Sequence, residues 1–340
     1  MNWKLGSVLA AALVLFGSLG RADDAAPTSR GAALLDYRPP PAIPFPDGNP
    51  YSPAKAELGR RLFFDPVFSN SRTMACATCH DPKLSWGDGR ARAHGDNAQD
   101  MSLRSPTLLD VAWMPHLGWD GKFRDLESVA FAPITAAANM NLKEDALLKR
   151  LNALPDYAAA FAAAFPDGAI SRRNIELALA TYERTIISGE APFDRWARGD
   201  ESAIDEAAKR GFDLFNGNAH CSGCHSGWTF SDGSFHDIGT AEGEDIGRGR
   251  LFPTSVKLRY AFKTPTLRDA ARRAPYMHDG SVPTLEAVID LYDRGGIKRP
   301  SRSELIGPLG LTGGEKSDLL AFLQTLSGAR PTAAPSIAPP

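Results

Sequence analysis

The sequence contains the motif C-x-x-C-H twice, and the two copies account for all four cysteines of the 340-residue chain. Two thiols at this spacing can add to the two vinyl groups of one haem, and the adjacent histidine then supplies the proximal ligand of the iron. The motif residues are Cys76, Cys79 and His80 in the first copy and Cys221, Cys224 and His225 in the second. The sequence therefore predicts two covalently bound haem c groups.

The N-terminal segment 1–22 has the pattern of a secretion signal. Lys4 supplies a positive charge, residues 7–18 form a short apolar stretch, and Ala22 ends a small-residue cleavage site. The stretch is shorter than the roughly 20 residues of a membrane-spanning helix, and no other segment comes close to that length. We predict a signal peptide at 1–22, Sec export to the periplasm and no membrane span after cleavage. An uncleaved N-terminal anchor is the alternative.

Zinc binding and disulfide bonding are the two alternative uses of four cysteines in an exported protein. A zinc site built from paired C-x-x-C units needs the pairs close in sequence, but Cys79 and Cys221 lie in different halves of the chain. Two disulfides would use the cysteines and leave the histidine after each pair unexplained. The histidine in both copies therefore favours haem c.

The composition is that of an ordinary globular protein. Hydrophobic residues make up 43% and charged residues 23% of the sequence, and the formal net charge is −2. A chain so close to neutrality has no global field that would attract nucleic acid, so we predict no nucleic-acid partner.

Changes of pattern along the chain divide it into segments. A helical pattern precedes each C-x-x-C-H motif, and residues 72–119 are expected to be mainly loop. Glycine and proline residues between 188 and 200 indicate a boundary. The predicted segments after the signal are an extended lead-in at 23–50, an N-terminal domain at 51–190, a C-terminal domain at 191–328 and a disordered tail at 329–340. We predict a mainly α fold with long irregular loops.

Several helix starts can be predicted from capping residues. Ser52 precedes a proline, Ser171 precedes an apolar stripe, and Asn141 with Glu144 has the spacing of a capping box. A further helix is expected over 203–215. No alternating pattern long enough for a credible strand appears.

The two halves of the chain follow one plan. A helix that ends in Leu62-Phe63-Phe64 precedes Cys76 by a short gap, and one that ends in Leu214-Phe215 precedes Cys221 by a shorter one. The repeated order of helix, short gap and haem motif indicates an internal duplication at low sequence identity.

Taken together, the motifs resemble those of the bacterial di-haem cytochrome c peroxidase and MauG family. The resemblance runs from about residue 49 to residue 327. Its landmarks besides the two haem motifs are ELGRRLF at 57–63, RSPTL at 104–108, WDG at 119–121, FHDIG at 235–239, KTPTLR at 263–268 and PYMHDG at 275–280. The ordered set is far more specific than either haem motif alone.

The resemblance implies two cytochrome-c-like haem domains with different tasks. In this family the N-terminal haem reacts with hydrogen peroxide, the C-terminal haem handles electrons, and a tryptophan lies between them. Trp119 matches that tryptophan, and a redox role is expected because its Trp-Asp-Gly motif is in register. A buried core aromatic is the alternative for Trp119.

Family members differ in the sixth ligand of the C-terminal haem, which is methionine in the peroxidases and tyrosine in MauG. The ligand position lies at a fixed spacing after the histidine of the His-Asp-Gly motif and is Tyr292 here. Tyr292 also continues the apolar stripe of a helix capped by Thr284, so a core role is the alternative. The resemblance implies ligation by Tyr292, and a phenolate would give a low-potential haem because it stabilises ferric iron.

The peroxide side departs from the family pattern. The family's distal glutamate falls on Asn139, which forms hydrogen bonds but cannot exchange a proton at neutral pH. The family's nearby glutamine falls on Val129, whereas Pro133 matches the distal proline of MauG. His94, on the loop that follows His80, corresponds to a loop histidine that ligates the N-terminal haem at rest in many of these peroxidases, and it is a candidate for the same role.

A calcium ion is often held between the domains of these proteins. The asparagine that helps to bind it falls on Arg104, and the carbonyl positions fall on Arg273 and Pro275. A cationic side chain in place of an amide ligand argues against calcium, which remains the weaker candidate beside the two haem c groups.

Two functions from different classes fit these residues. The first is a peroxide-dependent oxidoreductase that takes electrons from a small cytochrome c or cupredoxin, or that oxidises a partner protein on an aromatic residue. Tyr292 favours the second kind of partner, but Ala219 stands where MauG has a surface tryptophan, which argues against the MauG substrate itself. The rival is a non-enzymatic di-haem electron-transfer cytochrome, which the missing distal acid at Asn139 favours.

Overall fold

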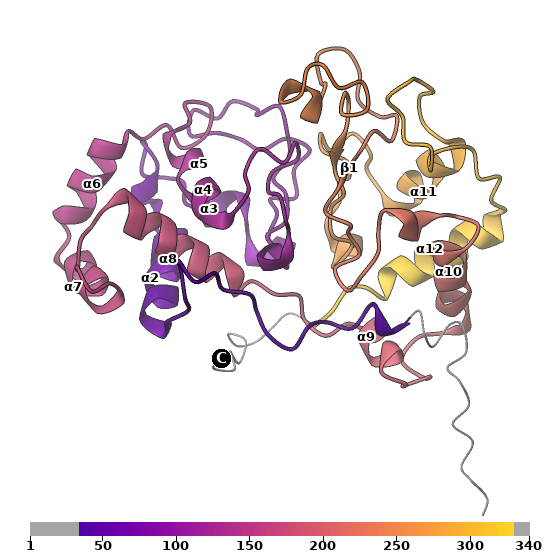
Figure 1. Ribbon diagram of the computed structural model, residues 1–340, viewed down its shortest axis with the longest axis horizontal. Helices are drawn as coiled ribbons and strands as arrows, with labels where there is room; N and C mark the ends of the chain where they lie inside the picture. Colours follow the sequence, from indigo (N-terminus) through magenta and orange to yellow (C-terminus); the bar gives the residue numbers. More distant parts are fainter. Residues whose placement is uncertain (1–33, 330–340) are drawn as a thin grey trace, which may run out of the picture.

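Two lobes of helices lie side by side in the computed structural model, which describes residues 34–329 (Figure 1). Helices α2 to α8 form the N-terminal lobe and α9 to α12 form the C-terminal lobe. The α-helices are α2 Pro53–Phe64, α3 Cys76–Cys79, α4 Leu126–Ala130, α5 Ala132–Thr135, α6 Glu144–Asn152, α7 Pro155–Ala164, α8 Arg172–Arg184, α9 Pro192–Ala197, α10 Glu206–Asn216, α11 Leu285–Arg294 and α12 Gly313–Gln324. Short 3-10 turns are η1 Pro66–Phe68, η2 Pro82–Leu84, η3 Val111–Trp113, η4 Cys221–Gly223, η5 Arg248–Arg250 and η6 Ala270–Arg272.

Sheet structure is small in the described part of the chain. β1 (Phe235–His236) pairs antiparallel with β2 (Phe262–Lys263), and the rest of the residues between helices form loops. The expectation of a mainly α fold with long irregular loops is confirmed. Among the described residues no helix is long and apolar enough to cross a membrane. The predicted signal peptide and all but one residue of the predicted tail lie outside the described residues.

The N-terminal lobe is built on a close crossing of α2 and α8. Gly59 of α2 makes this approach possible, because a Cβ atom there would lie 2.0 Å from the carbonyl oxygen of Ala178 in α8. Leu58, Leu62 and Phe63 of α2 are buried in the core that surrounds the crossing. The apolar face predicted for this helix is therefore the face that packs.

The C-terminal lobe repeats this crossing with α10 and α12. A Cβ atom on Gly211 of α10 would again lie 2.0 Å from a carbonyl oxygen, that of Asp318 in α12. The helix predicted from residue 203 begins at Glu206, because Asp205 caps it and accepts a hydrogen bond from the backbone of Ala208 at 2.8 Å. The core around it is aromatic and includes Phe193, Trp196, Phe212, Phe215, Phe230 and Phe322.

Both predicted serine caps form, and the predicted capping box does not. The hydroxyls of Ser52 and Ser171 each accept a hydrogen bond of 3.2 Å from a backbone N–H in the first turn of their helices. The capping box at Asn141 is wrong, since α6 begins at Glu144 after Lys143, which makes no side-chain cap. Asn141 has a φ of 52°, so its backbone forms a left-handed turn before the helix instead.

The lead-in passes beneath both lobes and connects them (Figure 1). Leu34 and Tyr37 are buried in the core of the C-terminal lobe, where the Tyr37 hydroxyl donates to Asn216 at 2.9 Å. Farther along, Asn49 donates from its amide to Glu127 of α4 at 2.7 Å. The described part of this segment thus contacts both lobes and links them.

Candidate haem-binding and active site

One cavity with a volume of about 670 Å³ is lined by both C-x-x-C-H motifs. It is continuous between the lobes, since residues of each lobe contribute to its lining. The predicted site residues that line it are Cys76, Cys79, His80, Trp119, Pro133, Asn139, Cys221, Cys224, His225 and Tyr292. Of the predicted site residues, His94 alone is outside this lining.

The first haem motif is held by a short helix and a turn. Cys76 and Cys79 lie at the two ends of α3 and are free thiols, not a disulfide. His80 follows the helix, and its Nδ1 lies 3.2 Å from the carbonyl oxygen of Trp86. Burial lowers the pKa of His80. The contact at Nδ1 leaves Nε2 as the atom of a neutral ring that can bind a metal.

The second haem motif uses the same device. Cys221 begins η4, Cys224 follows it directly, and both are also free thiols. The Nδ1 of His225 lies 2.9 Å from the carbonyl oxygen of Phe230, and burial lowers the pKa of this ring too. Each motif thus presents two thiols and one oriented, neutral imidazole to the cavity, which is the donor set that haem c requires.

Three cations in the lining, buried or half-buried, lack acidic partners among residues 34–329. Burial lowers the pKa of Lys263 to about 8 and that of Arg273 to about 10, and it also lowers the pKa of Arg104. The Nε atoms of Arg104 and Arg273 make no hydrogen bond. Buried cations without partners are costly, so this part of the cavity fits an anionic group such as a haem propionate.

The same arginines bear on the calcium question. The guanidinium of Arg104 donates to the carbonyl oxygen of Arg273 at 3.0 Å. That carbonyl corresponds to a calcium ligand in the family resemblance, and here it accepts a hydrogen bond from a cation. The contact strengthens the argument against calcium.

Trp119 is fixed by contacts to both lobes. Its indole N–H donates to the carbonyl oxygen of Arg104 at 3.0 Å, and its own carbonyl oxygen accepts from the backbone N–H of Lys263 at 2.8 Å. Its ring meets that of His278 edge to face, with centroids 6.5 Å apart. The indole is therefore held in one orientation at the junction of the two halves of the cavity.

Tyr292 and Pro133 occupy matching positions in the two lobes. Asp125 caps α4 and Thr284 caps α11, and each of the two residues follows its cap by eight positions. Both line the cavity. Burial raises the pKa of Tyr292, and the nearby thiols of the second motif raise it further. Tyr292 and Pro133 thus line the cavity at equivalent positions of the two lobes.

Asn139, Val129 and Pro133 line the same cavity, whereas His94 lies outside its lining. The His94 side chain is 42% exposed, and its Nε2 lies 2.7 Å from a carboxylate oxygen of Asp100. In this conformation the ring is engaged on the surface, so ligation by His94 stays a prediction that would need a movement of its loop.

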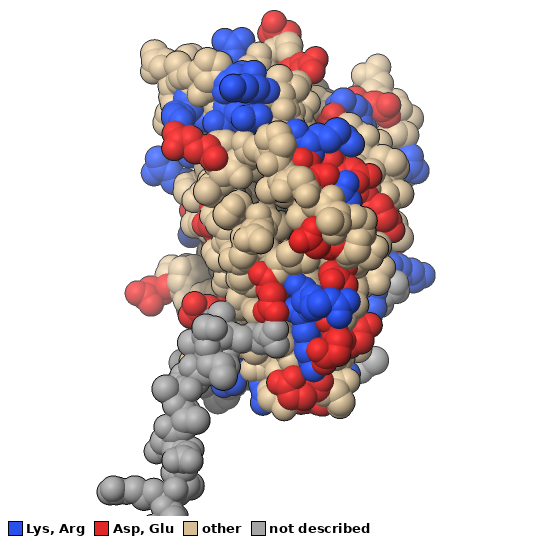
Figure 2. All heavy atoms as spheres, turned by 90° about the vertical axis from the view of Figure 1, so that its right-hand side faces the viewer, with Lys and Arg blue, Asp and Glu red and all other residues tan. Residues whose placement is uncertain are grey.

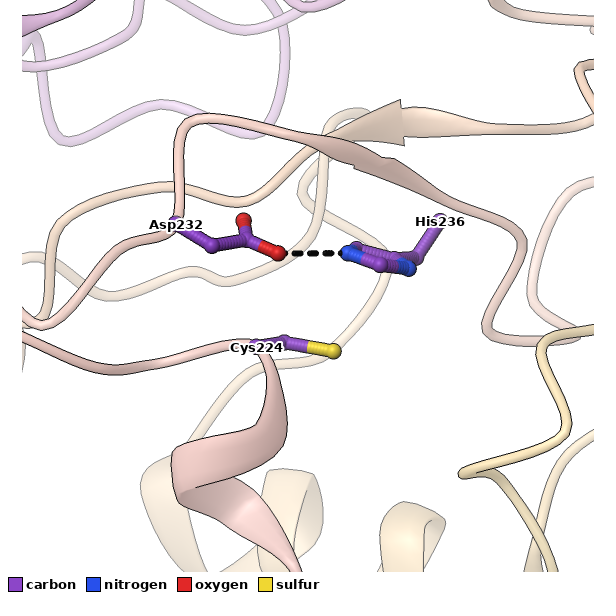
Figure 3. A group of neighbouring side chains, drawn as sticks. All are labelled: Cys224, Asp232 and His236. Atoms are coloured by element: carbon purple, nitrogen blue, oxygen red, sulfur yellow. Dashed lines mark hydrogen bonds and ion pairs between the residues drawn. The ribbon is translucent and has the colours of Figure 1, made fainter.

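A cluster beside the second motif did not emerge from sequence patterns. Figure 3 shows His236 and Asp232 joined by a contact of 2.8 Å, with the Cys224 sulfur beside them. The three ligand atoms lie within 4.8 Å of one another, as a metal site would require. Because Cys224 is a predicted haem-attachment residue, we interpret the group as an acid–base pair next to the predicted attachment point rather than as a metal site.

A second residue that sequence patterns missed is Glu183. It is 8% exposed, and it lines the cavity near Cys76. No motif distinguishes it, because it continues an ordinary helix. Only the structure shows that its carboxyl group faces the haem cavity.

Comparisons with known proteins define the class. The sequence model of the family described as di-haem cytochrome c peroxidase matches residues 53–202. The chain is 29% identical to the cytochrome c551 peroxidase of Pseudomonas aeruginosa over 322 residues, which cover 90% of each protein. The crystal structure of a MauG-like protein associated with microbial copper homeostasis superposes with a TM-score of 0.79 at 32% identity, covering 86% of this chain and 94% of that one. The fold and site are those of a di-haem peroxidase-type oxidoreductase.

One relative places the chain more narrowly. It is 50% identical over 305 residues to the methylamine utilization protein MauG of Methylorubrum extorquens, covering 89% of this chain and 86% of that protein. The chain belongs to the di-haem cytochrome c peroxidase and MauG family. The predicted family and enzyme class are confirmed, and the comparisons do not favour a non-enzymatic electron carrier.

Proposed function

We propose that the chain reduces hydrogen peroxide in the N-terminal half of the cavity, with electrons that enter from a protein partner through the C-terminal half. Haem c, when bound by each motif, supplies the redox chemistry. The proposed domains are those at 51–190 and 191–328. The proposal depends above all on one observation, that Pro133 and Tyr292 face the cavity at matching positions.

The two side chains have opposite consequences for an iron ligated by the histidine of the same lobe. Proline offers no donor atom, so Pro133 would leave an iron held by His80 free to take a small molecule such as peroxide. Tyrosine offers a phenolic oxygen, so Tyr292 would be able to ligate an iron held by His225. An open site suits catalysis and a closed one suits electron transfer.

Other residues of the chain support this division. The Asn139 amide can hold peroxide by hydrogen bonds, while Val129 and Pro133 keep the surroundings apolar. Trp119 is proposed to carry electrons between the two halves, because its ring is held at their junction by contacts to Arg104 and Lys263. A fixed aromatic ring needs little reorganisation when it is oxidised and reduced.

The partner is proposed to be a protein outside the cell's cytoplasm. The predicted signal peptide supports a periplasmic location. A small cytochrome c or cupredoxin could donate electrons, whereas Tyr292 and the 50% identity to MauG favour a protein substrate oxidised on an aromatic residue. Ala219 is small and 5% exposed, so it offers no aromatic group for contact with that substrate.

One face of the C-terminal lobe fits a protein partner better than a polyanion. On the face of the C-terminal lobe in Figure 2, acidic and basic side chains are interspersed around an uncharged area. Such a face has no field of one sign, which agrees with the net charge of −2.

Spectra of the ferric holoprotein test the proposal. We expect a high-spin electron paramagnetic resonance signal from the N-terminal haem that collapses when peroxide is added, and a low-spin signal from the C-terminal haem. The Tyr292→Phe variant should alter the second signal and leave the first. Two low-spin haems that do not respond to peroxide would contradict the proposed function. A clearly positive potential typical of His/Met ligation would contradict the role of Tyr292.

A further inference from the structure

The carboxyl group of Glu183 is buried in the N-terminal half of the cavity without a partner. The residue lies in the last turn of α8, is 8% exposed and belongs to the cavity lining. Among residues 34–329 its carboxyl group forms no hydrogen bond and no ion pair, and only longer-range charges act on it. Burying such a group without a partner costs free energy, so its presence calls for an explanation.

The C-terminal lobe has a leucine, Leu323, at the position that matches Glu183. Ala178 of α8 and Asp318 of α12 are equivalent positions, because a glycine of the crossing helix packs against the backbone carbonyl of each. Five residues after them come Glu183 and Leu323, which are each 8% exposed and which each line the cavity. Leucine fills the site well in one lobe, so packing alone does not require glutamate in the other.

Burial, rather than neighbouring charge, keeps Glu183 near its protonated form. Burial raises its pKa to about 8, Arg184 opposes this shift and Glu127 adds to it. Arg184 is engaged by Glu127 of α4, with two contacts of 2.7 and 2.9 Å, so it is not available as a partner. The remaining titratable neighbours are Tyr182 on the same helix and the Cys76 thiol on α3, which becomes a neutral thioether once haem is attached.

The reaction needs an acid of this kind. Reduction of one hydrogen peroxide to two waters breaks the O–O bond and consumes two electrons and two protons. The oxygen that leaves must receive a proton as the bond breaks, which a positioned acid promotes. Asn139 cannot give up a proton at neutral pH. The lining holds Asn139 where the family has its acid, and it holds Glu183 where the other lobe has a leucine.

We propose that Glu183 is the proton-relay residue of the N-terminal half of the cavity. Its carboxylic acid gives one proton, through water in the cavity, to the oxygen that leaves, and solvent supplies the second. The electrons come from the protein partner, and the carboxylate regains a proton from solvent after turnover. This inference rests on the proposed peroxide reaction and assigns to it a residue that replaces the missing distal acid.

The test compares three variants of the holoprotein with the wild type. Glu183→Gln keeps the shape but cannot exchange a proton, and Glu183→Leu copies the C-terminal lobe. Glu176→Gln is the matched control, because Glu176 lies two turns earlier on α8 and pairs with Arg172 at 2.8 Å. We expect the first two to slow the loss of the high-spin signal with peroxide by about 100-fold. The control should react at the wild-type rate.

Two further readouts separate proton transfer from packing. The wild-type rate should fall as the pH rises through about 8, whereas the rate of Glu183→Gln should not depend on pH there. The infrared difference spectrum of the peroxide reaction should contain a protonated-carboxyl band that Glu183→Gln lacks and Glu176→Gln retains. Glu183→Asp should recover most of the rate, because it restores an acid.

The possible outcomes distinguish the proposed function from the role of Glu183. A wild-type signal that ignores peroxide contradicts the proposed function itself. A responsive wild type with an unchanged rate in Glu183→Gln overturns only the role of Glu183. If Glu183→Asp and Glu183→Gln are equally slow and both keep the wild-type pH profile, the residue acts by packing and the proposal is wrong.

Discussion

The N-terminal and C-terminal lobes hold their histidine loops with matching hydrogen bonds. The Thr107 hydroxyl donates to the carbonyl oxygen of Ser85 at 2.7 Å, and the Thr266 hydroxyl donates to that of Thr229 at 2.6 Å. The same agreement holds for the helix crossings at Gly59 and Gly211, where the approach to a carbonyl is equally close. Backbone contacts of this kind define the shared frame, so positions in the two lobes can be compared one by one.

The lobes differ where side chains reach the cavity or support it. Pro133 matches Tyr292, and Glu183 matches Leu323. In the proposed reaction, one lobe leaves an open side and provides an acid, while the other provides a ligand and an apolar wall. The two lobes thus share a frame held by backbone contacts, and a few side chains carry the proposed difference in chemistry.

The buried ion pair of Glu127 and Arg184 has no counterpart at the matching positions of the C-terminal lobe, and its removal should have the largest effect. Glu127 of α4 and Arg184 of α8 make a two-pronged contact at 2.7 and 2.9 Å. The matching residues of the C-terminal lobe are Glu286, which is exposed, and the neutral Gln324. We expect Glu127→Gln to lower the free energy of unfolding of the N-terminal lobe by about 3–5 kcal/mol, because Arg184 is left buried without its partner.

Denaturant unfolding monitored at each haem checks this prediction. The matched control is Glu286→Gln, which should change stability by less than about 0.5 kcal/mol. The pH dependence gives a second check. Burial raises the pKa of Glu127, but hydrogen bonds from Arg184 and Asn49 outweigh it, and the pKa lies below its ordinary value of 4.5. The contribution is therefore present above pH 4.5 and is lost below it, where wild type and Glu127→Gln should converge.

Replacing the glycine at either helix crossing should destabilise its lobe by a similar amount. A methyl group at Gly59 or Gly211 would meet a backbone carbonyl oxygen at 2.0 Å, and backbone cannot move aside easily. We expect Gly59→Ala and Gly211→Ala each to destabilise by about 3 kcal/mol, at the upper end of overpacking effects. Gly48→Ala is the control, since a Cβ atom there has no neighbour within 4 Å. Thermal unfolding that shows only one lobe to be sensitive would contradict the proposed equivalence.

Placing the residue type of Tyr292 at position 133 tests whether the two lobes have different functions. Pro133→Tyr gives the N-terminal lobe the phenol of the other lobe, so its haem should become six-coordinate and lose access to peroxide. We expect the rate of reaction with peroxide to fall at least about 100-fold, equivalent to about 2.7 kcal/mol. The control Pro133→Phe adds the ring without the donor oxygen and should keep the high-spin signal. Equal spectra for the two variants would show that the hydroxyl at this position does not reach the iron.

Much of the frame could be predicted from the sequence because it depends on local signals. The caps at Ser52 and Ser171 satisfy the backbone N–H groups of their own helices, and each haem motif is contiguous. The family resemblance brought Trp119 and Tyr292 into consideration because the motifs that place them are short and ordered. These features need no knowledge of which distant segments meet.

Features that depend on contacts between distant segments were not predicted. The carboxyl group of Glu183 could have pointed to solvent, and only the packing of α8 shows that it faces the cavity. The pairing of Glu127 with Arg184 joins residues 57 positions apart. Asn141 misled the prediction, because its spacing fits a capping box while its backbone forms a turn. Local patterns cannot resolve such cases, since the deciding contacts lie elsewhere in the chain.

A smaller asymmetry concerns a pair of buried aspartates that follow the two histidine-loop threonines. Asp269 accepts hydrogen bonds from the Ser85 hydroxyl at 2.9 Å and the Gly328 N–H at 3.2 Å. Asp110 accepts one from the Ser188 N–H at 2.9 Å, and its other oxygen has no partner among the described residues. Burial raises the pKa of Asp110 from 3.8 to about 6. The two aspartates therefore differ in how completely their carboxylate oxygens are hydrogen-bonded.

Asp110→Asn should accordingly increase the free energy of unfolding, because the raised pKa of Asp110 means that its ionised form destabilises the fold. Folding opposes ionisation of Asp110, so its penalty begins above pH 3.8, the ordinary pKa, and is complete above about pH 6. An amide removes that penalty, and we expect a gain of about 2 kcal/mol at pH 8 that disappears near pH 4. Asp269→Asn is the comparison and should lose about 1–2 kcal/mol at pH 8, because both carboxylate oxygens of Asp269 accept hydrogen bonds. A loss of stability in Asp110→Asn at pH 8 would show that the N-terminal lobe depends on this charge, and the asymmetry between the two aspartates would then have to be abandoned.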